Sequence, residues 1–321
     1  MKLLTAISVV AAVAAFVVPA SAQDYPTRPI TLINPYSAGG PADLIGRTVA
    51  EGMSQILGQP VVVENRPGAA TAIAATYVAK ADPDGYTLLI AGSPTHVITP
   101  ALQKVNYEGI AGFSPVSMVA NVPNVLVVST ASGIKTVQDL VAKAKVADDA
   151  VSFASVGNGS LPHLSSVLFQ QRTETKLVHI PYGGAAPAVV DILGGNVDMG
   201  FLNAPPMMAY FSSGELTPLA IAASTRSEQL PDVQTMEELG YGEFEMSTWY
   251  GISAPAGTPD DVVAKLNDAI NQTMQTPEVR ERLTKQGVQL FYKSTADFAS
   301  YLASDADRVI TLINDAGVAP K

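Results

Sequence analysis

The stretch ITLINPYSAGGPADLIGR, residues 30–47, joins an apolar run to a glycine-rich loop and then to an amphipathic segment. The β-branched residues of 30–33 predict a buried strand. Pro41 suits the first position of a helix, where its missing N–H would be unpaired in any case. Asp43 would then lie in the first helical turn and face the positive end of the helix dipole. We therefore expect a strand, a loop and a helix start.

Two neighbouring glycines, Gly39 and Gly40, lie in the loop between this strand and this helix. Glycine adopts positive φ at no steric cost and lets a ligand approach the backbone closely. Free N–H groups at a helix start suit an anion. A tight turn between a strand and a helix would need the same glycines, so the loop alone leaves both interpretations open. If the loop binds an anion, we expect a β-branched residue at either glycine to oppose positive φ and to weaken binding.

Several short motifs resemble, in order along the chain, the signatures of the tripartite tricarboxylate transporter substrate-binding proteins, also called Bug receptors. Residues 35–43 read PYSAGGPAD, where that family usually has P-F-x-x-G-G-x-x-D. The other motifs are ENRPGA at 64–69, DPDGYT at 82–87, GNGS at 157–160, HL at 163–164, PYGG at 181–184 and APAGTP at 254–259. Each motif is weak alone, but the ordered set covers nearly the whole mature chain.

The amino terminus predicts a signal peptide at residues 1–22. Lys2 is followed by an apolar run over 3–18, and an A-x-A pattern ends at Ala22. An uncleaved membrane anchor is the alternative, but the apolar run is short for a span. We therefore expect an exported protein, located in the periplasm, whose mature chain starts near Gln23 and does not insert into the membrane.

Composition limits the partners and the chemistry. The chain has 321 residues, enough for one large or two ordinary domains, and no cysteine, which excludes disulfides and a cysteine-bound metal. Its formal net charge of −10 disfavours nucleic acid and anionic membranes as partners. The same charge repels an anionic ligand, so we expect any such ligand to be held by local dipoles.

Strand and helix patterns alternate in two series, which favours a sheet with helices on both faces in each half. Residues 115–129 are extended but interrupted by Pro123, and we interpret them as two strands with a crossing between domains near 121–124. Expected strands are 30–33, 61–63, 86–91, 151–154, 178–180, 197–202, 219–223 and 249–254. Expected helices are 42–57, 71–80, 137–145, 161–171, 185–193, 259–275, 277–286 and 295–316.

The resemblance implies the type II periplasmic-binding-protein fold, an α/β architecture with two lobes and a ligand cleft between them. The interrupted double series places lobe I at 23–122 plus 247–321 and lobe II at 123–246. We expect the hinge near 121–124 and 247–249.

No constellation of residues predicts catalysis, a metal or a cofactor. His96, His163 and His179 lack metal-ligand spacing. Ser160 follows a glycine loop but not a G-x-S-x-G elbow, and a helix N-cap is its ordinary role. Arg47 and Arg66 lie near the glycine loops in sequence, yet we favour surface or lobe-stabilising roles for both.

The resemblance also implies a carboxylate ligand held between the first-strand loop and loops of the second lobe. Carried over by position, the ligand-binding residues are Tyr36, Ser37, Ala38, Gly39, Gly40, Asp43, Ser93, Thr95, Ser155, Gly157, Gly159, Ser160, His163, Tyr182, Gly183 and Asp198. The chain departs from the family pattern at three places: Tyr36 replaces the usual phenylalanine, Ser37-Ala38 replaces alanine-proline, and Ala69-Ala70-Thr71 replaces a glycine-containing turn.

Together these features predict a monomeric, non-catalytic receptor. It would capture a small organic carboxylate and deliver it to the membrane subunits of a tripartite tricarboxylate-type transporter. An exported hydrolase or isomerase acting on a similar acid is one alternative, and the ligand-binding component of a membrane sensor is another.

Overall fold

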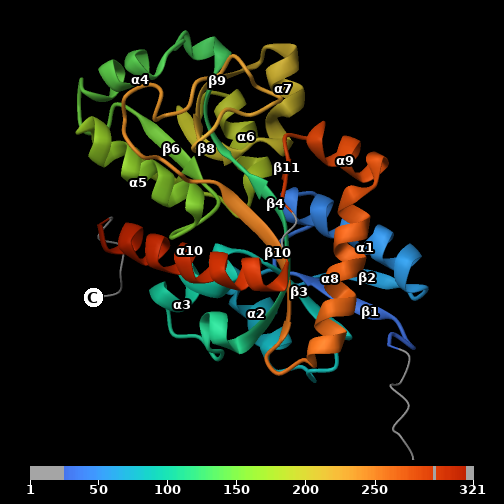
Figure 1. The fold of residues 1–321 in the computed structure, drawn as a ribbon. Helices are drawn as coiled ribbons and strands as arrows, with labels where there is room; N and C mark the ends of the chain where they lie inside the picture. Colours follow the sequence, from blue (N-terminus) through green and yellow to red (C-terminus); the bar gives the residue numbers. More distant parts are fainter. Residues whose placement is uncertain (1–24, 292–293, 316–321) are drawn as a thin grey trace, which may run out of the picture.

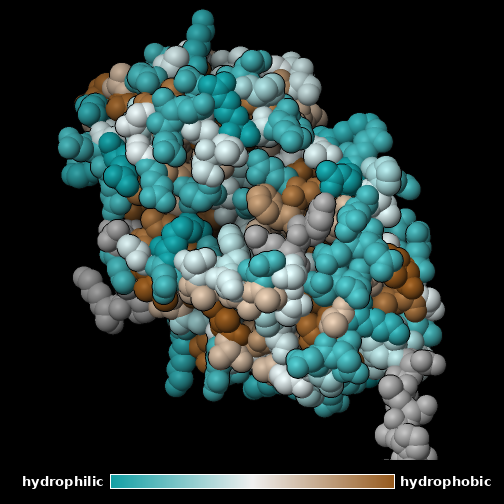
Figure 2. All heavy atoms as spheres, in the orientation of Figure 1, coloured by the Kyte–Doolittle hydropathy of each residue, from teal (hydrophilic) through white to brown (hydrophobic). Residues whose placement is uncertain are grey.

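The computed structural model describes residues 25–291 and 294–315, which form two lobes, each a β-sheet flanked by helices (Figure 1). The expected signal peptide, 1–22, lies outside the described residues. Among the described residues, no helix is both long and apolar enough to span a membrane. On the face shown in Figure 2, the surface of both lobes is largely hydrophilic, with apolar residues in scattered patches.

The sheet of the first lobe has six strands in the order β11-β4-β10-β3-β1-β2. Three are parallel: β1 (Ile30–Asn34), β2 (Val61–Asn65) and β3 (Thr87–Ala91). The antiparallel β10 (Thr248–Pro255) lies between β3 and β4 (Phe113–Val122), and the short β11 (Gln289–Leu290) forms an edge.

Helices cover both faces of this sheet. Helices α1 (Pro41–Leu57) and α8 (Asp260–Gln275) pack on one face, and α2 (Ala72–Ala79) packs on the other. Strand β1 shows the period of two that this arrangement requires, since Ile30 and Leu32 join the α1 side and Ile33 joins the α2 side. Helix α9 (Pro277–Thr284) follows α8.

The second lobe has five strands in the order β7-β6-β8-β5-β9. They are β5 (Asn124–Ser129), β6 (Ser152–Ser155), β7 (Val178–Pro181), β8 (Met199–Asn203) and β9 (Leu216–Ala222). One face carries α4 (Val137–Ala144) and α5 (Leu161–Thr173), and the other carries α6 (Ala185–Leu193) and α7 (Met208–Ser213).

The register of the strands turns the carboxyl edges of both sheets toward the crossing between the lobes. In the first lobe, Val122 pairs with Thr248, at the edge where the parallel strands β1 to β3 end. In the second, Asn124 at the start of β5 pairs with Asn203 at the end of β8, and β6 and β7 run parallel to β8. The loops after these strands therefore lie on two edges that face one another.

Pro123 alone separates β4 from β5, and the side chain of Asn203 fastens this crossing. Its Nδ2, which carries two hydrogens, has three acceptors within reach: the carbonyl of Val122 at 3.2 Å, Oδ1 of Asn124 at 2.9 Å and Oγ1 of Thr248 at 3.1 Å. Both chain crossings are thus held by one amide.

Helix α10 (Thr295–Asp315) bridges the lobes. Phe298 and Leu302 pack near Trp249 of β10, whereas Val309 and Ile313 join the core of the second lobe. The expected division assigned all of 247–321 to the first lobe, but the carboxyl-terminal half of α10 packs against the second.

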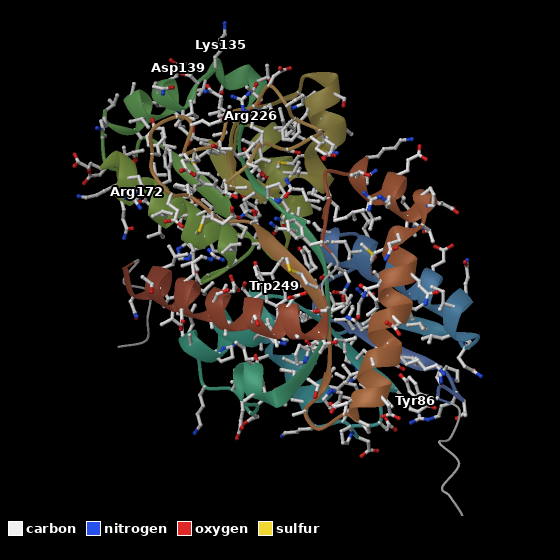
Figure 3. All side chains as sticks on the ribbon, in the orientation of Figure 1. Tyr86, Lys135, Asp139, Arg172, Arg226 and Trp249 are labelled. Carbon is white, nitrogen blue, oxygen red and sulfur yellow. The ribbon has the colours of Figure 1, made fainter. Side chains whose placement is uncertain are left out.

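Asp305 anchors this helix from its buried middle. Its Oδ2 accepts from the indole Nε1 of Trp249 at 2.7 Å and from Oγ of Ser93 at 2.6 Å, and its Oδ1 accepts from Arg308 at 2.5 Å. Figure 3 shows Trp249 on β10 beside α10.

No helix was expected between the predicted strand at 86–91 and residue 115, but the segment directly after β3 is helical. A π-helical turn, Pro94–Ile98, runs directly into α3 (Thr99–Leu102). Val97 and Ile98 pack into the core of the second lobe, so contacts made only in the folded molecule stabilise this helix. The short α7 and β11 were not predicted either, because neither has a repeating pattern long enough to detect.

We expect the Asp305→Leu substitution to lower the free energy of unfolding by about 3–5 kcal/mol, because it leaves the charge of Arg308 without its buried partner. It also removes the acceptor of the Trp249 indole and of the Ser93 hydroxyl. Urea denaturation measures the loss, and Asp307→Ala, at an exposed position of the same helix, is the control. A loss for Asp305→Leu no larger than the control's would contradict the anchoring role.

Candidate functional site

The loops named by the sequence follow the carboxyl ends of β1, β6 and β7. Residues 35–40 follow β1, residues 156–160 follow β6, and residues 182–184 follow β7. These ends lie on the two sheet edges that face each other at the crossing, where open α/β sheets bind ligands. The structure therefore gathers loops of both lobes into one region.

The two glycines of the first loop have different conformations. Gly39 has φ +86°, in the left-handed region, whereas Gly40 has φ −87° and ψ 177° and is extended. The expectation of positive φ is therefore correct for Gly39 and wrong for Gly40. A Cβ added at Gly40 would meet nothing closer than the carbonyl oxygen of Ser37 at 4.0 Å.

Asp43 braces this loop. Its carboxylate accepts from the N–H of Gly39 at 3.1 Å, from Nε of Arg47 at 3.0 Å and from Nδ2 of Asn65 at 3.1 Å. Burial raises the pKa of Asp43, but the hydrogen bonds from Arg47, Gly39 and Asn65 outweigh burial and hold that pKa below its usual value. The carboxylate therefore positions the loop, and Arg47 has the stabilising role expected for it.

Four backbone amides around this loop remain available. The N–H groups of Ser37, Ala38, Gly40 and Ala42 make no hydrogen bond to the described part of the chain. Residues 37–39 are exposed, and α1 begins directly behind them. A helix start with open amides is a site for an anion.

The hydroxyls of Ser93 and Thr95 are already used within the protein, and both residues are buried. Ser93 donates to Asp305, and the Oγ1 of Thr95 bonds to Gly92 and to Nδ1 of His96. In this conformation, these two predicted ligand residues shape the end of β3 and do not offer their hydroxyls to a ligand.

The loop after β6 also satisfies its own polar groups. Ser160 is the N-cap of α5, as expected, and its Oγ donates to the carbonyl of Gly157 at 2.6 Å and accepts from the N–H of His163. Gly157 N–H donates to Oγ of Ser155, and Gly159 N–H donates to Nδ1 of His163 at 3.0 Å. These polar groups therefore hold the conformation of the loop and are not free to donate hydrogen bonds to a ligand.

A stacked pair of imidazoles supports that loop. The rings of His163 and His179 lie 4.2 Å apart, and Nε2 of His179 lies 2.6 Å from Oγ of Ser155. Burial, and then the neighbouring His179, lowers the pKa of His163 to about 4, and burial also lowers the pKa of His179. Both rings are therefore neutral near pH 7 and add no positive charge to the site.

Gly159 lies where the two lobes touch. Its φ is +73°, and an added Cβ would lie 2.2 Å from a methyl carbon of Leu102 in α3. A larger residue would thus push the second-lobe loop away from the first lobe.

The loop after β7 leaves a second set of amides open. The N–H groups of Gly183, Gly184, Ala185 and Ala186, at the start of α6, make no hydrogen bond to any described residue. The Tyr182 hydroxyl is engaged, since it donates to Oδ2 of Asp191 at 2.6 Å. Burial, followed by the Asp191 carboxylate, raises the pKa of Tyr182 to about 12.

Asp198 lies away from the other predicted ligand-binding residues. It precedes β8, and its carboxylate accepts from the N–H and Oγ of Ser152, at the start of β6, and from Lys143. Burial raises the pKa of Asp198, but these hydrogen bonds outweigh burial and lower it overall. The predicted ligand loops follow the carboxyl ends of β6 and β7, and β8 runs parallel to β6, so Asp198, before β8, lies at the opposite edge of the sheet.

Two residues at the crossing were not predicted. The Tyr250 hydroxyl donates to Oδ1 of Asn203 at 3.4 Å, between a strand of one lobe and a strand end of the other. Asn203 directly follows the expected strand 197–202, and a polar residue at the carboxyl end of a strand could have been predicted to lie near the site. Tyr250 lies inside an expected strand, where its sequence context gives no signal.

The described residues contain no group of three or more histidine, aspartate or glutamate side chains arranged to hold a metal ion. The Ser155–His179 contact pairs a hydroxyl with a base, but Ser155 is fully buried. Among the described residues, no carboxylate bonds to His179, so no third group orients that base.

Residues 45–318 match the model of the tripartite tricarboxylate transporter family receptor. The protein BugT of Bordetella pertussis is 38% identical over 318 residues, which cover 98% of each chain. The structure of Rpa4515 of R. palustris with adipate has a TM-score of 0.88 and 31% identity, covering 93% of this chain and 100% of that one. The structure of MatC from Rhodopseudomonas palustris with bound malate has a TM-score of 0.83 and 30% identity, covering 90% of this chain and 100% of that one. Matches of this extent, together with the two-lobe fold, establish that the chain belongs to the tripartite tricarboxylate transporter receptor family.

Proposed function

We propose that this receptor captures a small organic dicarboxylate in the periplasm and delivers it to the membrane subunits of a tripartite tricarboxylate-type transporter. One observation carries the proposal: two sets of unpartnered amides, at the starts of α1 and α6, lie on sheet edges that face each other at the crossing. Each set suits one carboxylate.

Local donors must overcome the charge of the whole protein, which is −10. Hydrogen bonds from amides to a carboxylate contribute roughly 1.5–3 kcal/mol each. The nearby arginines are engaged elsewhere. Arg47 bonds to Asp43, and Arg66 bonds to Glu64 at 2.6 Å and lies over the ring of Tyr77 at 3.7 Å. Backbone amides and helix dipoles are therefore the groups that attract the ligand.

The ligands of the two solved relatives support a dicarboxylate. Adipate and malate each carry a carboxylate at both ends. A ligand of that form places one anionic group in each lobe, which matches one amide set per lobe. Because one chain holds both sets, we propose that a monomer is sufficient for binding.

We propose that lobe I (23–122 and 247–321) and lobe II (123–246) close on the ligand about the crossings at 121–124 and 247–249. Helix α10 contacts both lobes and must shift along one of them during this motion. Hinge closure around a ligand is the common motion of two-lobe receptors.

We propose binding without catalysis, because the serines of the two Ser–His contacts, Ser155–His179 and Ser253–His96, are fully buried and no carboxylate among the described residues bonds to either histidine. The exported position follows from the expected signal peptide and the family.

A thermal-shift screen of mono-, di-, tri- and aromatic carboxylates tests the proposal. A dicarboxylate present at 100 times its Kd stabilises the folded state by about 2.7 kcal/mol, so we expect it to raise the melting temperature in a concentration-dependent way. Monocarboxylates at the same concentration serve as the control. A protein that no carboxylate stabilises, or one that converts the added acid to a product, would refute the proposal.

We expect Gly40→Val to weaken dicarboxylate binding at least tenfold, or about 1.4 kcal/mol, in calorimetric titration. The reason is occupation of space and not backbone strain, because Gly40 is extended and valine adopts that conformation. The new side chain would stand among the open amides of the loop. The melting temperature without ligand should stay close to that of the unmodified protein.

Arg47→Ala is the matched comparison. It removes a nearby positive charge but leaves the open amides in place, so its affinity loss should be smaller than that of Gly40→Val. If Arg47→Ala abolishes binding and Gly40→Val spares it, a salt bridge holds the anion and the amide mechanism is wrong.

A further inference from the structure

We propose that Tyr36 determines ligand specificity, because its hydroxyl bonds to a hydroxyl or oxo oxygen on the carbon chain of the bound dicarboxylate. The inference rests on the proposed function and adds the class of ligand: a dicarboxylate with a polar substituent between its two ends. The inference is argued from the position of the Tyr36 side chain, from its hydroxyl, which has no hydrogen-bond partner among the described residues, and from its partial exposure.

Tyr36 lies at the start of the first ligand loop, directly after β1. Its N–H donates to Oδ1 of Asn34 at 3.2 Å, and its ring packs against the core of the first lobe. The hydroxyl reaches the end of β3, where a Cβ added at Gly92 would lie 4.0 Å from it. The side chain therefore runs along the carboxyl edge of the sheet, beside the open amides of residues 37–42.

The Tyr36 hydroxyl makes no hydrogen bond to the described part of the chain. Three tyrosines of the two lobes do have partners: Tyr25 donates to the carbonyl of Gly85 at 2.6 Å, Tyr182 to Asp191 and Tyr250 to Asn203. Tyr36 differs from the tyrosines without a bonded hydroxyl because it lies in the first ligand loop. A polar group in such a position calls for an explanation, and a ligand or an ordered water supplies one.

Tyr107 makes the contrast clear. Its hydroxyl also has no partner, but it is closed off from solvent. Tyr36 is half-buried beside the exposed residues 37–39, and its hydroxyl is not sealed from solvent as that of Tyr107 is. The two residues therefore differ in access and not in chemistry.

The chemistry of a phenol fits a neutral oxygen on the ligand. Burial raises the pKa of Tyr36 above its ordinary value, so the group is neutral and both donates and accepts hydrogen bonds. The loop amides take a terminal carboxylate, and the phenol, which projects from the loop toward β3, reaches a different ligand atom. A plain methylene at that atom leaves the hydroxyl without a partner, and such a mismatch is how a polar site rejects an unsubstituted analogue.

Calorimetric titration of malate and succinate tests the inference, because the two acids differ only by one hydroxyl. We expect the unmodified receptor to bind malate more tightly than succinate by about tenfold, the worth of one net hydrogen bond. Tyr36→Phe should lower malate affinity by about tenfold and leave succinate affinity within about twofold, so that the preference disappears. Tyr107→Phe, which deletes the inaccessible hydroxyl, is the matched control and should preserve the preference.

Three results would overturn the inference: an unmodified receptor without any preference, a Tyr36→Phe variant with an unchanged ratio, or a variant that loses both acids equally. The last result would assign Tyr36 a packing role. These outcomes are distinct from failure of the proposed function, in which the unmodified receptor binds no dicarboxylate at all.

Discussion

The side-chain amide of Asn203 is the contact on which the geometry of the site depends. The two N–H groups of its Nδ2 are shared among acceptors at the end of β4, the start of β5 and the start of β10. These are the two places where the chain crosses between the lobes. Since strand direction then follows from the register, the ends of β1, β6 and β7 must face one another. The crossing therefore fixes the position in which the predicted ligand loops of the two lobes face each other.

Within those loops, most polar side chains bond to the protein itself, whereas several backbone N–H groups make no such bond to the described residues. The Asp43 carboxylate and the hydroxyls of Ser155 and Ser160 are spent on holding the loops in shape. Among the described residues of these loops, several backbone N–H groups, the Ser37 hydroxyl and the Tyr36 phenol make no hydrogen bond within the protein, and we propose that a ligand uses them. Such a site attracts an anion without an unpaired positive charge, and this suits a protein whose net charge is strongly negative.

Local patterns were sufficient to predict most of the elements. The strand-loop-helix at 30–47, the alternation in each half and the break at Pro123 all correspond to observed elements. The N-cap role of Ser160 was also predicted, because it depends only on residues three positions apart. Features that depend on long-range contacts were not predictable. The helix at 94–102 packs into the core of the second lobe, a contact that no local pattern indicates. The helix at 295–316 was predicted, but its packing against both lobes was not. Asp198 was carried over by position from the resemblance, and its bonds to Ser152 and Lys143 depend on a strand pairing that local spacing does not reveal.

The position of Trp249 has an optical consequence. It is the single tryptophan of the chain, and it lies in the strand by which the chain returns to the first lobe. Its indole is fully buried among Phe298, Tyr301 and His96 and is bonded to the helix that bridges the lobes. Any shift of that helix against the strand changes the polarity and the quenching groups around the indole. The protein thus carries an intrinsic fluorophore at the joint of the proposed closure, so stopped-flow fluorescence can test for that motion without an attached dye.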